Sequence, residues 1–346
     1  MIYTTLPGTS LKVSKICLGT MTWGKQNSQS DAFGQMNYAL EHGVNFFDTA
    51  ELYAIPKERE TQGATETIIG NWFKETGNRN KVILASKIAG PAKFNNHYIR
   101  EKVYTKEAFE DALHHSLKRL QTDHIDLYQL HWPDRATNFF GQRGVTKLTE
   151  TEYVDRTQEI LEILNGFIKD GKIGVIGLSN ETPWGTMNFL EKSRAYDLPK
   201  ISTVQNPYNL LNRTYEIGMS EISLREDVGL LPYSPLGFGR LSDKFLDGSD
   251  VSSSRIELFP SMSRYNRLNA LKATEAYYRL AKAHGISLAV LALAFVNTRP
   301  FVTSNIIGAT TMEQLKENIT SASYVPDASL LKAIEEIHEG NPNPAP

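Results

Sequence analysis

Short apolar runs alternate with longer amphipathic segments along almost the whole chain. Eight runs rich in Val, Ile and Leu can be counted: Ile16–Gly19, Val44–Asp48, Val82–Lys87, Ile125–His131, Ile173–Ser179, Ile201–Gln205, Leu230–Ser234 and Ile306–Gly308. Continuous apolar runs are typical of strands that are buried on both faces, as in a parallel sheet. The pattern therefore predicts eight buried, parallel strands.

The segments between these runs have helical periodicity. Apolar residues recur at spacings of three and four between Phe109 and Leu120, and again between Ile160 and Ile168. This spacing places them on one face of a helix. Glycines that follow predicted helix ends, at Gly43, Gly171 and Gly285, are normal C-terminal stops. We therefore predict helices between the strands.

The repeated alternation of strand and helix predicts a (β/α)₈ TIM barrel, an α/β fold that closes on itself. An open, doubly wound sheet is the structural alternative. The residues around Pro7-Gly8 predict a short N-terminal hairpin that precedes the barrel. No linker divides the chain, so residues 1–346 are interpreted as a single domain.

Two irregular segments, Asp134–Thr151 and Leu246–Ser263, each follow a predicted strand. In a barrel they would be long loops on the C-terminal face, where active sites are built. The last residues, Asn341–Pro346, are rich in proline, and we expect this tail to be frayed.

The composition and charge argue against several classes of protein, including those that bind nucleic acid or a membrane. Charged residues make up 22% of the chain and the formal net charge is −2, so neither nucleic acid nor a membrane is expected as a partner. The single cysteine, Cys17, cannot form an internal disulfide and suits an inert buried thiol in a reducing compartment. No signal peptide is visible, and the longest apolar stretch, Leu288–Val296, is about half a membrane span. We predict a soluble, cytoplasmic protein.

Ionisable side chains lie at the ends of three consecutive predicted strands. Asp48 ends one run and is followed by Tyr53, Lys87 ends the next run, and His131 ends the one after that. Because the ends of parallel barrel strands meet on one face, these side chains are predicted to share a pocket. A charge at the end of a buried strand is costly unless it is paired, so we predict an ion pair between Asp48 and Lys87.

These residue types suit the reduction of a carbonyl. An ammonium lowers the pKa of a nearby phenol, so Lys87 is expected to bring the pKa of Tyr53 down from about 10. Tyr53 could then donate a proton to the carbonyl oxygen while His131 orients that oxygen. Each residue has a simpler interpretation: an accidental spacing from Asp48 to Tyr53, a lysine that reaches solvent, or a hydrogen-bonded core histidine. Their joint occurrence on successive strands favours the catalytic interpretation.

Six motifs resemble signatures of the aldo-keto reductase family and extend from about Gly19 to Asn318. They are VNFFDTAELY at 44–53, LKRLQTDHIDLYQLHWP at 117–133, GVIGLSN at 174–180, VQNPY at 204–208, YSPLGFG at 233–239 and IGATTMEQLKEN at 307–318. Within the family, the chain is most similar to the bacterial Tas-type branch, near the potassium-channel β subunits. The resemblance implies an oxidoreductase that uses NADPH to reduce an aldehyde or ketone, with a catalytic tetrad of Asp48, Tyr53, Lys87 and His131.

The resemblance also implies which residues hold NADP(H). The nicotinamide amide would be held by Ser179, Asn180 and Gln205, and Tyr233 would stack on the ring. The nicotinamide side would be lined by Gly19, Thr20 and Met21.

The other end of the cofactor would be held by later segments. The pyrophosphate and adenosine would be followed by Ser234, Leu236, Gly237, Gly239 and Lys244. The adenine ribose and base would be bound by Thr310, Gln314, Glu317 and Asn318. The turn that begins at Gly308 opens a helix whose N-terminus can attract a phosphate, and the candidates for the 2′-phosphate are Lys244 and Arg255.

The chain departs from the pattern of the small reductases at two inserts. Ala54–Thr65 follows the tyrosine of the tetrad, and Asp134–Thr151 follows the histidine. Both are expected to border the pocket for a small carbonyl substrate. Phe139, Phe140 and Trp23 are candidates for its lining, with ordinary loop packing as the alternative.

Two other functions are compatible with these residues. One is a regulatory module that binds NADPH and docks on a partner, as the channel β subunits do. The other is a Schiff-base aldolase that uses Lys87, although the cofactor motifs argue against it. No metal site is expected, because His114 and His115 lie on a predicted helix beside basic residues and suit a solvated face.

Overall fold

The computed structural model describes residues 1–91, 98–99, 104–142, 144–148, 154–260 and 263–346. Its centre is an eight-stranded parallel sheet in the order β10-β3-β4-β5-β6-β7-β8-β9. The strands are β3 (Ile16–Gly19), β4 (Phe46–Asp48), β5 (Ile83–Ile88), β6 (Ile125–Leu130), β7 (Ile173–Ser179), β8 (Ile201–Gln205), β9 (Gly229–Leu230) and β10 (Asn305–Ile307). The prediction of eight buried parallel strands is confirmed.

The two edges of this sheet meet, so it is a barrel and not an open sheet. The Leu230 N–H of β9 donates to the Phe301 carbonyl at 2.8 Å, and the Thr303 N–H donates to the Leu230 carbonyl at 2.9 Å. The Ile306 N–H of β10 donates to the Pro232 carbonyl at 3.0 Å. These bonds join the last part of the β9 segment to the residues that lead into β10, which confirms the predicted (β/α)₈ fold.

The seventh predicted strand, Leu230–Ser234, is shorter in the structure than its apolar pattern suggested. Only Gly229–Leu230 forms β9, and Tyr233 makes an isolated bridge with Pro207. Pro232 interrupts the ladder because proline has no N–H to donate. The chain can therefore turn into the segment at 234–239 that follows, which contains several residues with positive φ angles.

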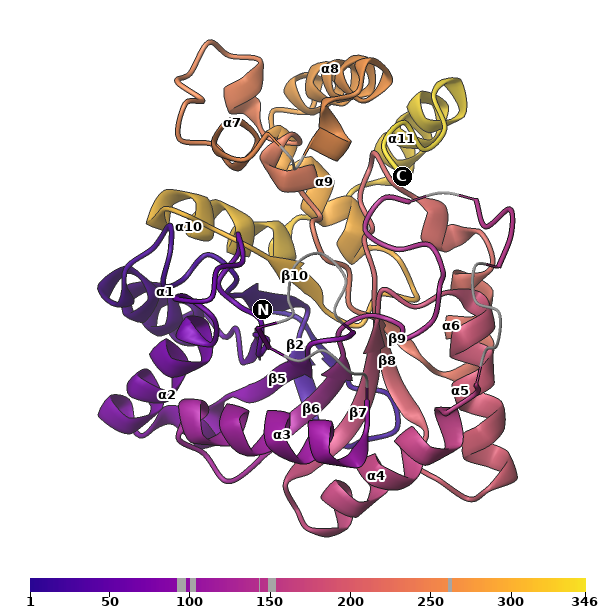
Figure 1. The fold of residues 1–346 in the computed structure, drawn as a ribbon. Coiled ribbons are helices and arrows are strands. Elements are labelled where there is room, and N and C mark those ends of the chain that lie inside the picture. The colour runs from indigo at the N-terminus through magenta and orange to yellow at the C-terminus, as the bar shows by residue number, and fades with distance from the viewer. Residues whose placement is uncertain (92–97, 100–103, 143, 149–153, 261–262) are drawn as a thin grey trace.

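Helices surround the strands on the outside (Figure 1). The ring consists of α1 (Gln29–Glu41), α2 (Ala64–Thr76), α3 (Lys106–Leu120), α4 (Thr157–Lys169), α5 (Pro183–Ala195), α6 (Met219–Glu226), α9 (Leu288–Asn297) and α10 (Met312–Thr320). Two further helices, α8 (Leu268–Ala283) and α11 (Ala328–Gly340), pack against each other and lie at the top of Figure 1, beyond the ring. The predicted helices at Phe109–Leu120 and Ile160–Ile168 correspond to α3 and α4. In Figure 1 α10 lies beside α1, which completes the ring.

A hairpin closes the N-terminal end of the barrel, as predicted. Strands β1 (Tyr3–Thr5) and β2 (Lys12–Ser14) pair antiparallel. Leu6 and Val13 of this hairpin pack against Cys17 and other buried residues inside the barrel. Burial raises the pKa of the Cys17 thiol well above its usual value, in agreement with an inert thiol. With this end plugged, a pocket can open only at the C-terminal end of the barrel.

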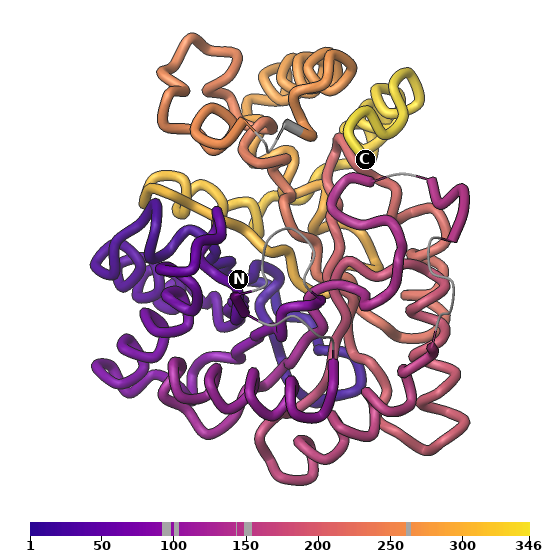
Figure 2. Tube along the Cα trace, in the orientation of Figure 1, coloured from indigo at the N-terminus to yellow at the C-terminus, as the bar shows by residue number. Residues whose placement is uncertain are grey.

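The segment between β9 and α9 extends away from the ring, at the top of Figure 2. It contains Leu246–Ser263, which was expected to be a long loop. A short helix, α7 (Arg255–Leu258), forms within it. Residues 261–262 of this segment lie outside the described residues.

The expectation of a frayed C-terminal tail is wrong. The Ala345 N–H donates to the Leu211 carbonyl at 3.0 Å, and the Arg213 N–H donates to the Asn343 side chain at 2.6 Å. Ala345 is fully buried. The tail packs because the loop after β8 offers backbone groups that it can pair with, which composition alone does not reveal.

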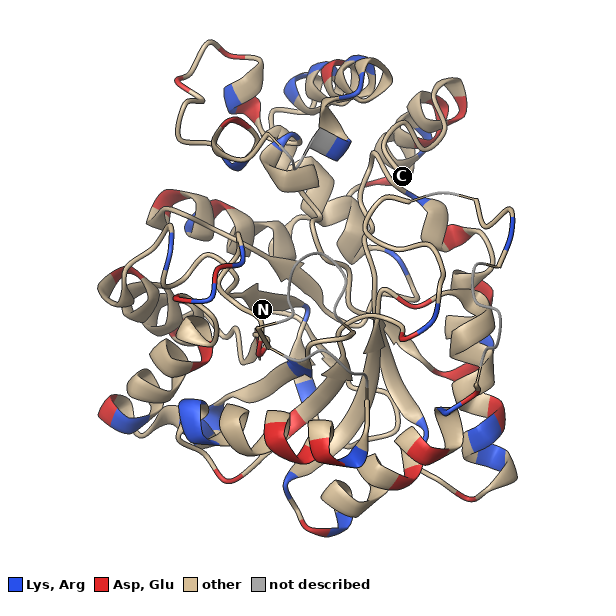
Figure 3. Ribbon diagram, viewed as in Figure 1, with Lys and Arg blue, Asp and Glu red and all other residues tan. Residues whose placement is uncertain are grey.

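Basic and acidic residues are interspersed along the outer helices (Figure 3). Among the residues described, no single helix is long and apolar enough to cross a membrane. Only α8 and α9 taken together reach that length and apolar content, and they are bent by 94° relative to each other.

Candidate active site

Five strands bring their predicted site residues to the C-terminal end of the barrel. Asp48 is the last residue of β4, Lys87 lies near the end of β5, and His131 directly follows β6. Ser179 and Gln205 are the last residues of β7 and β8. Because these strands are parallel and adjacent, the structure brings the five positions together.

Lys87 and Asp48 form the predicted ion pair. The Lys87 Nζ lies 2.6 Å from the Asp48 Oδ2 and also donates to the Thr49 carbonyl at 2.7 Å. The Lys87 side chain is fully buried, so it does not reach solvent. Burial by itself lowers the pKa of Lys87, but Asp48 and then Tyr53 raise it, and the net pKa lies above its usual value.

The charge state of Lys87 bears on the aldolase alternative. A Schiff-base lysine needs a depressed pKa so that its amine is neutral and nucleophilic. The raised pKa of Lys87 and its bond to Asp48 keep the amine protonated. The geometry therefore disfavours an aldolase mechanism at this position.

Tyr53 lies beside this pair, with its ring centroid 5.0 Å from the Lys87 Nζ. The expected direction of its pKa shift is wrong. Burial raises the pKa of Tyr53, and although Lys87 lowers it, the net pKa lies above its usual value. Burial destabilises the phenolate by removing it from water, and this effect is larger than the stabilisation by the nearby Lys87 ammonium. The negative charge of Asp48 also partly offsets the effect of that ammonium on the phenolate. The phenol is therefore protonated at neutral pH and can act as a proton donor.

His131 faces the edge of the Tyr53 ring, with ring centroids 5.7 Å apart and planes at 76°. Burial, and then the charge of Lys87, lower the pKa of His131 well below its usual value, so the imidazole is neutral. Its Nδ1 is buried and has no hydrogen-bond partner among the described residues. That is not what a hydrogen-bonded core histidine would show.

Amide side chains extend the centre across the barrel. The Gln205 Nε2 donates to the Asp48 Oδ1 at 2.8 Å. The Asn180 Nδ2 donates to the His131 carbonyl at 2.9 Å, and the Tyr233 hydroxyl donates to the Asn180 Oδ1 at 2.7 Å. The predicted nicotinamide residues are thus linked to the tetrad.

Sequence reasoning missed Gln129. This fully buried residue of β6 donates from its Nε2 to the Asp48 Oδ1 at 3.2 Å. A signal was available: Leu127 packs inside the barrel, and side chains two residues apart on a strand share a face. Gln129 was therefore a polar residue at an inward position, two residues before His131.

Arg264, which follows α7, was also missed. Burial by itself lowers the pKa of its guanidinium, but the nearby Tyr233 and Tyr265 raise it, and the net pKa lies above its usual value. Nothing in the sequence pattern marks Arg264, because it belongs to a segment without regular periodicity.

The segment proposed for the pyrophosphate has an unusual backbone. Gly237, Phe238 and Gly239 have φ angles of 54°, 57° and 94°, a run of left-handed residues. Glycine adopts these angles readily. The N–H groups of Gly237 and Gly239 are used within the loop, where they donate to the Ser234 and Leu236 carbonyls, both at 2.9 Å. Ser234 also has a positive φ of 53°, and its carbonyl accepts from the Asn209 side chain at 2.9 Å. Leu236, between them, packs against the hydrophobic core.

The two candidate cations for the 2′-phosphate lie in different places. Lys244 is half-buried beside the Phe245 ring, with its Nζ 5.4 Å from the centroid. The Arg255 Nη1 lies 3.4 Å from the Met21 sulfur, and its charge is near enough to Tyr53 to lower the pKa of that phenol. The structure thus places Arg255 near Tyr53 and the predicted nicotinamide side.

The candidates for the adenine end gather at the start of α10. The Gln314 Oε1 accepts from the Thr310 N–H at 2.9 Å, and the Asn318 Nδ2 donates to the Gly308 carbonyl at 3.1 Å. Glu317 lies on the same helix.

Thr20 and Gly19, predicted to line the nicotinamide side, lie next to the end of β4. The Thr20 hydroxyl donates to the Asp48 carbonyl at 2.9 Å. Gly19, which precedes it, is paired with Asp48 in the sheet.

The first insert, Ala54–Thr65, borders the site as expected. The Ile55 N–H donates to the Met21 carbonyl at 2.9 Å, and the Gly63 N–H donates to the Tyr53 carbonyl at 2.7 Å. The insert is therefore bonded to the segments that flank the predicted nicotinamide position.

The second insert, Asp134–Thr151, places aromatic rings next to the site, although its residues 143 and 149–151 lie outside those described. Phe139 packs with Trp132, and Phe140 is partly exposed with its ring centroid 6.0 Å from that of Trp132. Trp23, in contrast, is fully buried in the main core and donates to the Gln35 side chain at 3.0 Å. The interpretation of Trp23 as a pocket wall is wrong, because it packs beneath the surface.

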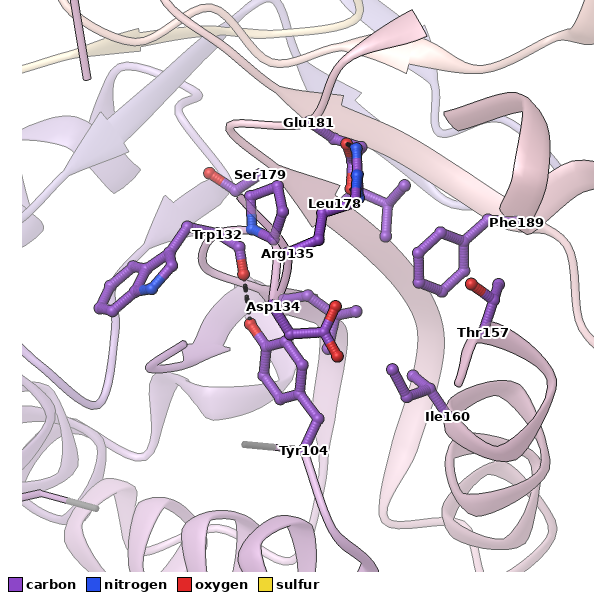
Figure 4. A pocket seen from close by; sticks show the side chains of 12 residues that line it. Tyr104, Trp132, Asp134, Arg135, Thr157, Ile160, Leu178, Ser179, Glu181 and Phe189 are labelled. Carbon is purple, nitrogen blue, oxygen red and sulfur yellow. Dashed lines mark hydrogen bonds and ion pairs between the residues drawn. The ribbon is translucent and has the colours of Figure 1, made fainter. Parts of the chain in front are cut away.

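A small cavity lies behind the site, between β6, β7, α4 and α5 (Figure 4). The Tyr104 hydroxyl donates to the Trp132 carbonyl at 2.7 Å on one side of it. On another side the Arg135 Nη1 donates to the Glu181 Oε2 at 3.0 Å. These bonds anchor the start of the second insert, directly after the histidine of the tetrad.

Comparison with known proteins places the chain among proteins of one family. The model of the aldo/keto reductase family matches residues 15–339. Protein tas of Escherichia coli is 46% identical over the whole of both chains. An uncharacterized oxidoreductase of Bacillus subtilis, YrpG, is 33% identical over 98% of this chain and 97% of its own. A probable voltage-gated potassium channel subunit beta of Arabidopsis thaliana is 28% identical over 99% and 98% of the two chains.

Proposed function

The chain belongs to the aldo/keto reductase family, and we propose that it is an NADPH-dependent oxidoreductase that reduces aldehydes or ketones to alcohols, with residues 1–346 acting as one domain. One observation carries this proposal. A buried Lys87–Asp48 pair, with Nζ and Oδ2 2.6 Å apart, lies beside a protonated Tyr53 and a neutral His131. This arrangement supplies a proton donor and a carbonyl-orienting group at one point.

The residues around this centre fit a nicotinamide cofactor. The His131 Nδ1 is a buried polar atom that has no hydrogen-bond partner among the described residues, so it is available to a bound group. Ser179, Asn180 and Gln205 would hold the carboxamide, and Tyr233 would stack on the ring. When bound, NADPH supplies a hydride for the carbonyl carbon.

Proton transfer to the carbonyl oxygen is assigned to Tyr53. Its raised pKa keeps the proton on the phenol until an oxyanion, a stronger base, develops beside it. The neutral His131 hydrogen-bonds the same oxygen and orients it, and this bond strengthens as charge develops there. Lys87 stabilises the phenolate that remains, and Asp48 keeps Lys87 in position.

The substrate pocket is proposed to lie under the two inserts. Trp132, Phe139 and Phe140 form an aromatic cluster directly after the tetrad histidine. A flat, apolar wall of this kind suits an aromatic or hydrophobic carbonyl compound.

A regulatory module that binds NADPH and turns it over slowly is the second candidate. The similarity to a probable potassium channel β subunit, at 28% identity, favours it. Tight retention of NADPH together with negligible reduction of every carbonyl compound would support this function.

The decisive experiment is a screen of aldehydes, ketones and sugars at saturating NADPH, with NADPH consumption followed by absorbance. We expect consumption with at least one aromatic aldehyde, and equimolar alcohol as the product. A Thr203→Val variant serves as the matched control, because it alters a barrel-wall side chain whose hydroxyl has no hydrogen-bond partner in the part of the chain that the structure describes. No turnover with any substrate class, by protein that binds NADPH, would refute the reductase.

A further inference from the structure

Gln129 is a fully buried polar side chain to which the proposed chemistry assigns no role. It lies across the barrel interior between two residues that have one. Its Nε2 donates to the Asp48 Oδ1 at 3.2 Å, and its Oε1 accepts from the Gln205 Nε2 at 3.2 Å. The Gln205 Nε2 also donates to the Asp48 Oδ1, at 2.8 Å, so the three side chains form a closed set.

The charge of Asp48 determines how both amides are oriented. A carboxylate only accepts hydrogen bonds, so the atoms of Gln129 and Gln205 that face the Asp48 Oδ1 are both amide nitrogens. Lys87 occupies the other carboxylate oxygen, Oδ2. The oxygen of Gln129 is then directed to the second N–H of Gln205. Both donors of Gln205 are used, and its Oε1 is left as an acceptor directed away from Asp48.

The barrel wall leaves room for this arrangement. Gly177 of β7 lies between β6 and β8, which carry the two glutamines. A Cβ at Gly177 would be 3.2 Å from the Gln129 Cγ and 2.7 Å from the Thr203 hydroxyl. A side chain here would press first on the Thr203 hydroxyl, and it would also crowd the Gln129 Cγ and the Leu127 Cδ1, each at 3.2 Å. The glycine therefore leaves open the space beside Gln129.

We propose that Gln129 is a positioning residue that holds the amide of Gln205, so that the Gln205 Oε1 accepts a hydrogen bond from the carboxamide N–H of the nicotinamide. This inference rests on the proposed function. Without Gln129, the Gln205 amide keeps its bond to Asp48 but loses the partner of its second N–H. It can then rotate, and its oxygen is no longer held toward the cofactor.

A comparison of two ligands tests this role. NADPH carries the nicotinamide, whereas 2′,5′-ADP has only the adenosine half. In Gln129→Met, which conserves volume, the loss of one neutral hydrogen bond should weaken NADPH by about 2–10-fold. The affinity for 2′,5′-ADP should be unchanged, as should both affinities in the Thr203→Val control. Gln129→Asn, a shorter amide that cannot reach both partners, should reproduce the loss if the apolar variant does not fold.

A double-mutant cycle separates positioning from general damage. If Gln129 acts through Gln205, then Gln129→Met should have no further effect on NADPH affinity in a Gln205→Ala background. Additive losses, equal weakening of both ligands, or unchanged NADPH affinity in Gln129→Met would each overturn the inference while the proposed function stands. A wild-type protein that does not bind NADPH would overturn the proposed function and this inference with it.

Discussion

The cationic side chain at the strand ends differs from those in the segment after β9 in whether a carboxylate lies next to it. Lys87, at a strand end, is fully buried and bonded to both Asp48 and the Thr49 carbonyl. Lys244 and Arg255, in the loop, have no carboxylate within ion-pair distance among the described residues, and burial lowers the pKa of each. Because Lys87 already has a counter-ion, its charge serves to shift the pKa values of the groups beside it. A cation that is removed from water without a counter-ion can instead bind an anionic ligand. The comparison separates a fixed centre for chemistry from a segment suited to binding phosphate.

The strand-end centre is tested most severely by Tyr53→Phe. The change removes only the hydroxyl, so turnover should fall by about 10²–10⁴-fold, the usual contribution of general acid catalysis. The NADPH affinity should stay near the wild-type value, because the ring remains. Steady-state kinetics and a fluorescence titration measure the two quantities. Near-normal turnover would remove Tyr53 from the mechanism.

Lys87→Met tests whether the neutralised cation tunes its neighbour. Lys87 lowers the pKa of Tyr53, so its loss raises that pKa further above the usual value. The acid must be protonated to act, so activity declines only as pH rises through the Tyr53 pKa, and this alkaline decline should move to higher pH in the variant.

Lys87→Met should also lower overall turnover, because the phenolate loses its stabilising charge. Leaving Asp48 buried without its partner should cost about 3–5 kcal/mol in the free energy of unfolding. A pH–rate profile and a urea titration measure these effects. A folded variant with an unchanged alkaline limb would contradict the tuning role.

Lys244→Ala tests the loop side of the comparison. A charge-assisted hydrogen bond to the 2′-phosphate is worth about 1.5–3 kcal/mol, so NADPH should bind about 10–100-fold more weakly while NADH is nearly unaffected. Added salt should reduce the wild-type preference for NADPH. Fluorescence titration with both cofactors distinguishes the outcomes. Equal weakening of both, or of neither, would remove Lys244 from the 2′-phosphate site.

Thr203→Val is expected to have the smallest effect on activity and stability. It compares two equally buried positions of the barrel, Thr203 and Lys87. Thr203 is as buried as Lys87, but its hydroxyl has no partner among the described residues. Replacing an unpartnered buried hydroxyl by a methyl should raise the free energy of unfolding by about 1 kcal/mol, with activity unchanged. A loss of stability on denaturant unfolding would mean that this hydroxyl has a bonding role.

The sequence by itself determined the eight parallel strands and the meeting of Asp48, Lys87 and His131 at their ends. Eight apolar runs with few polar interruptions are typical of strands that are buried on both faces, as in a parallel sheet covered by helices. The closure of that sheet into a barrel was decided by the hydrogen bonds between β9 and the residues that lead into β10. Parallel strands end on one face of the barrel, so identifying the strands was enough to predict that Asp48, Lys87 and His131 lie close together. The ion pair followed because a buried charge needs a partner.

Only the tertiary structure decided how these residues are surrounded. The pKa of Tyr53 rises because burial outweighs Lys87, a balance that depends on distances and depth through space. Gln129 and Gln205 are 76 residues apart in the chain and come into contact only inside the folded barrel. The buried Trp23 likewise depends on contacts between distant segments. Local patterns specify which way a residue faces along its own strand or helix, whereas its partners come from elements that the chain brings together only on folding.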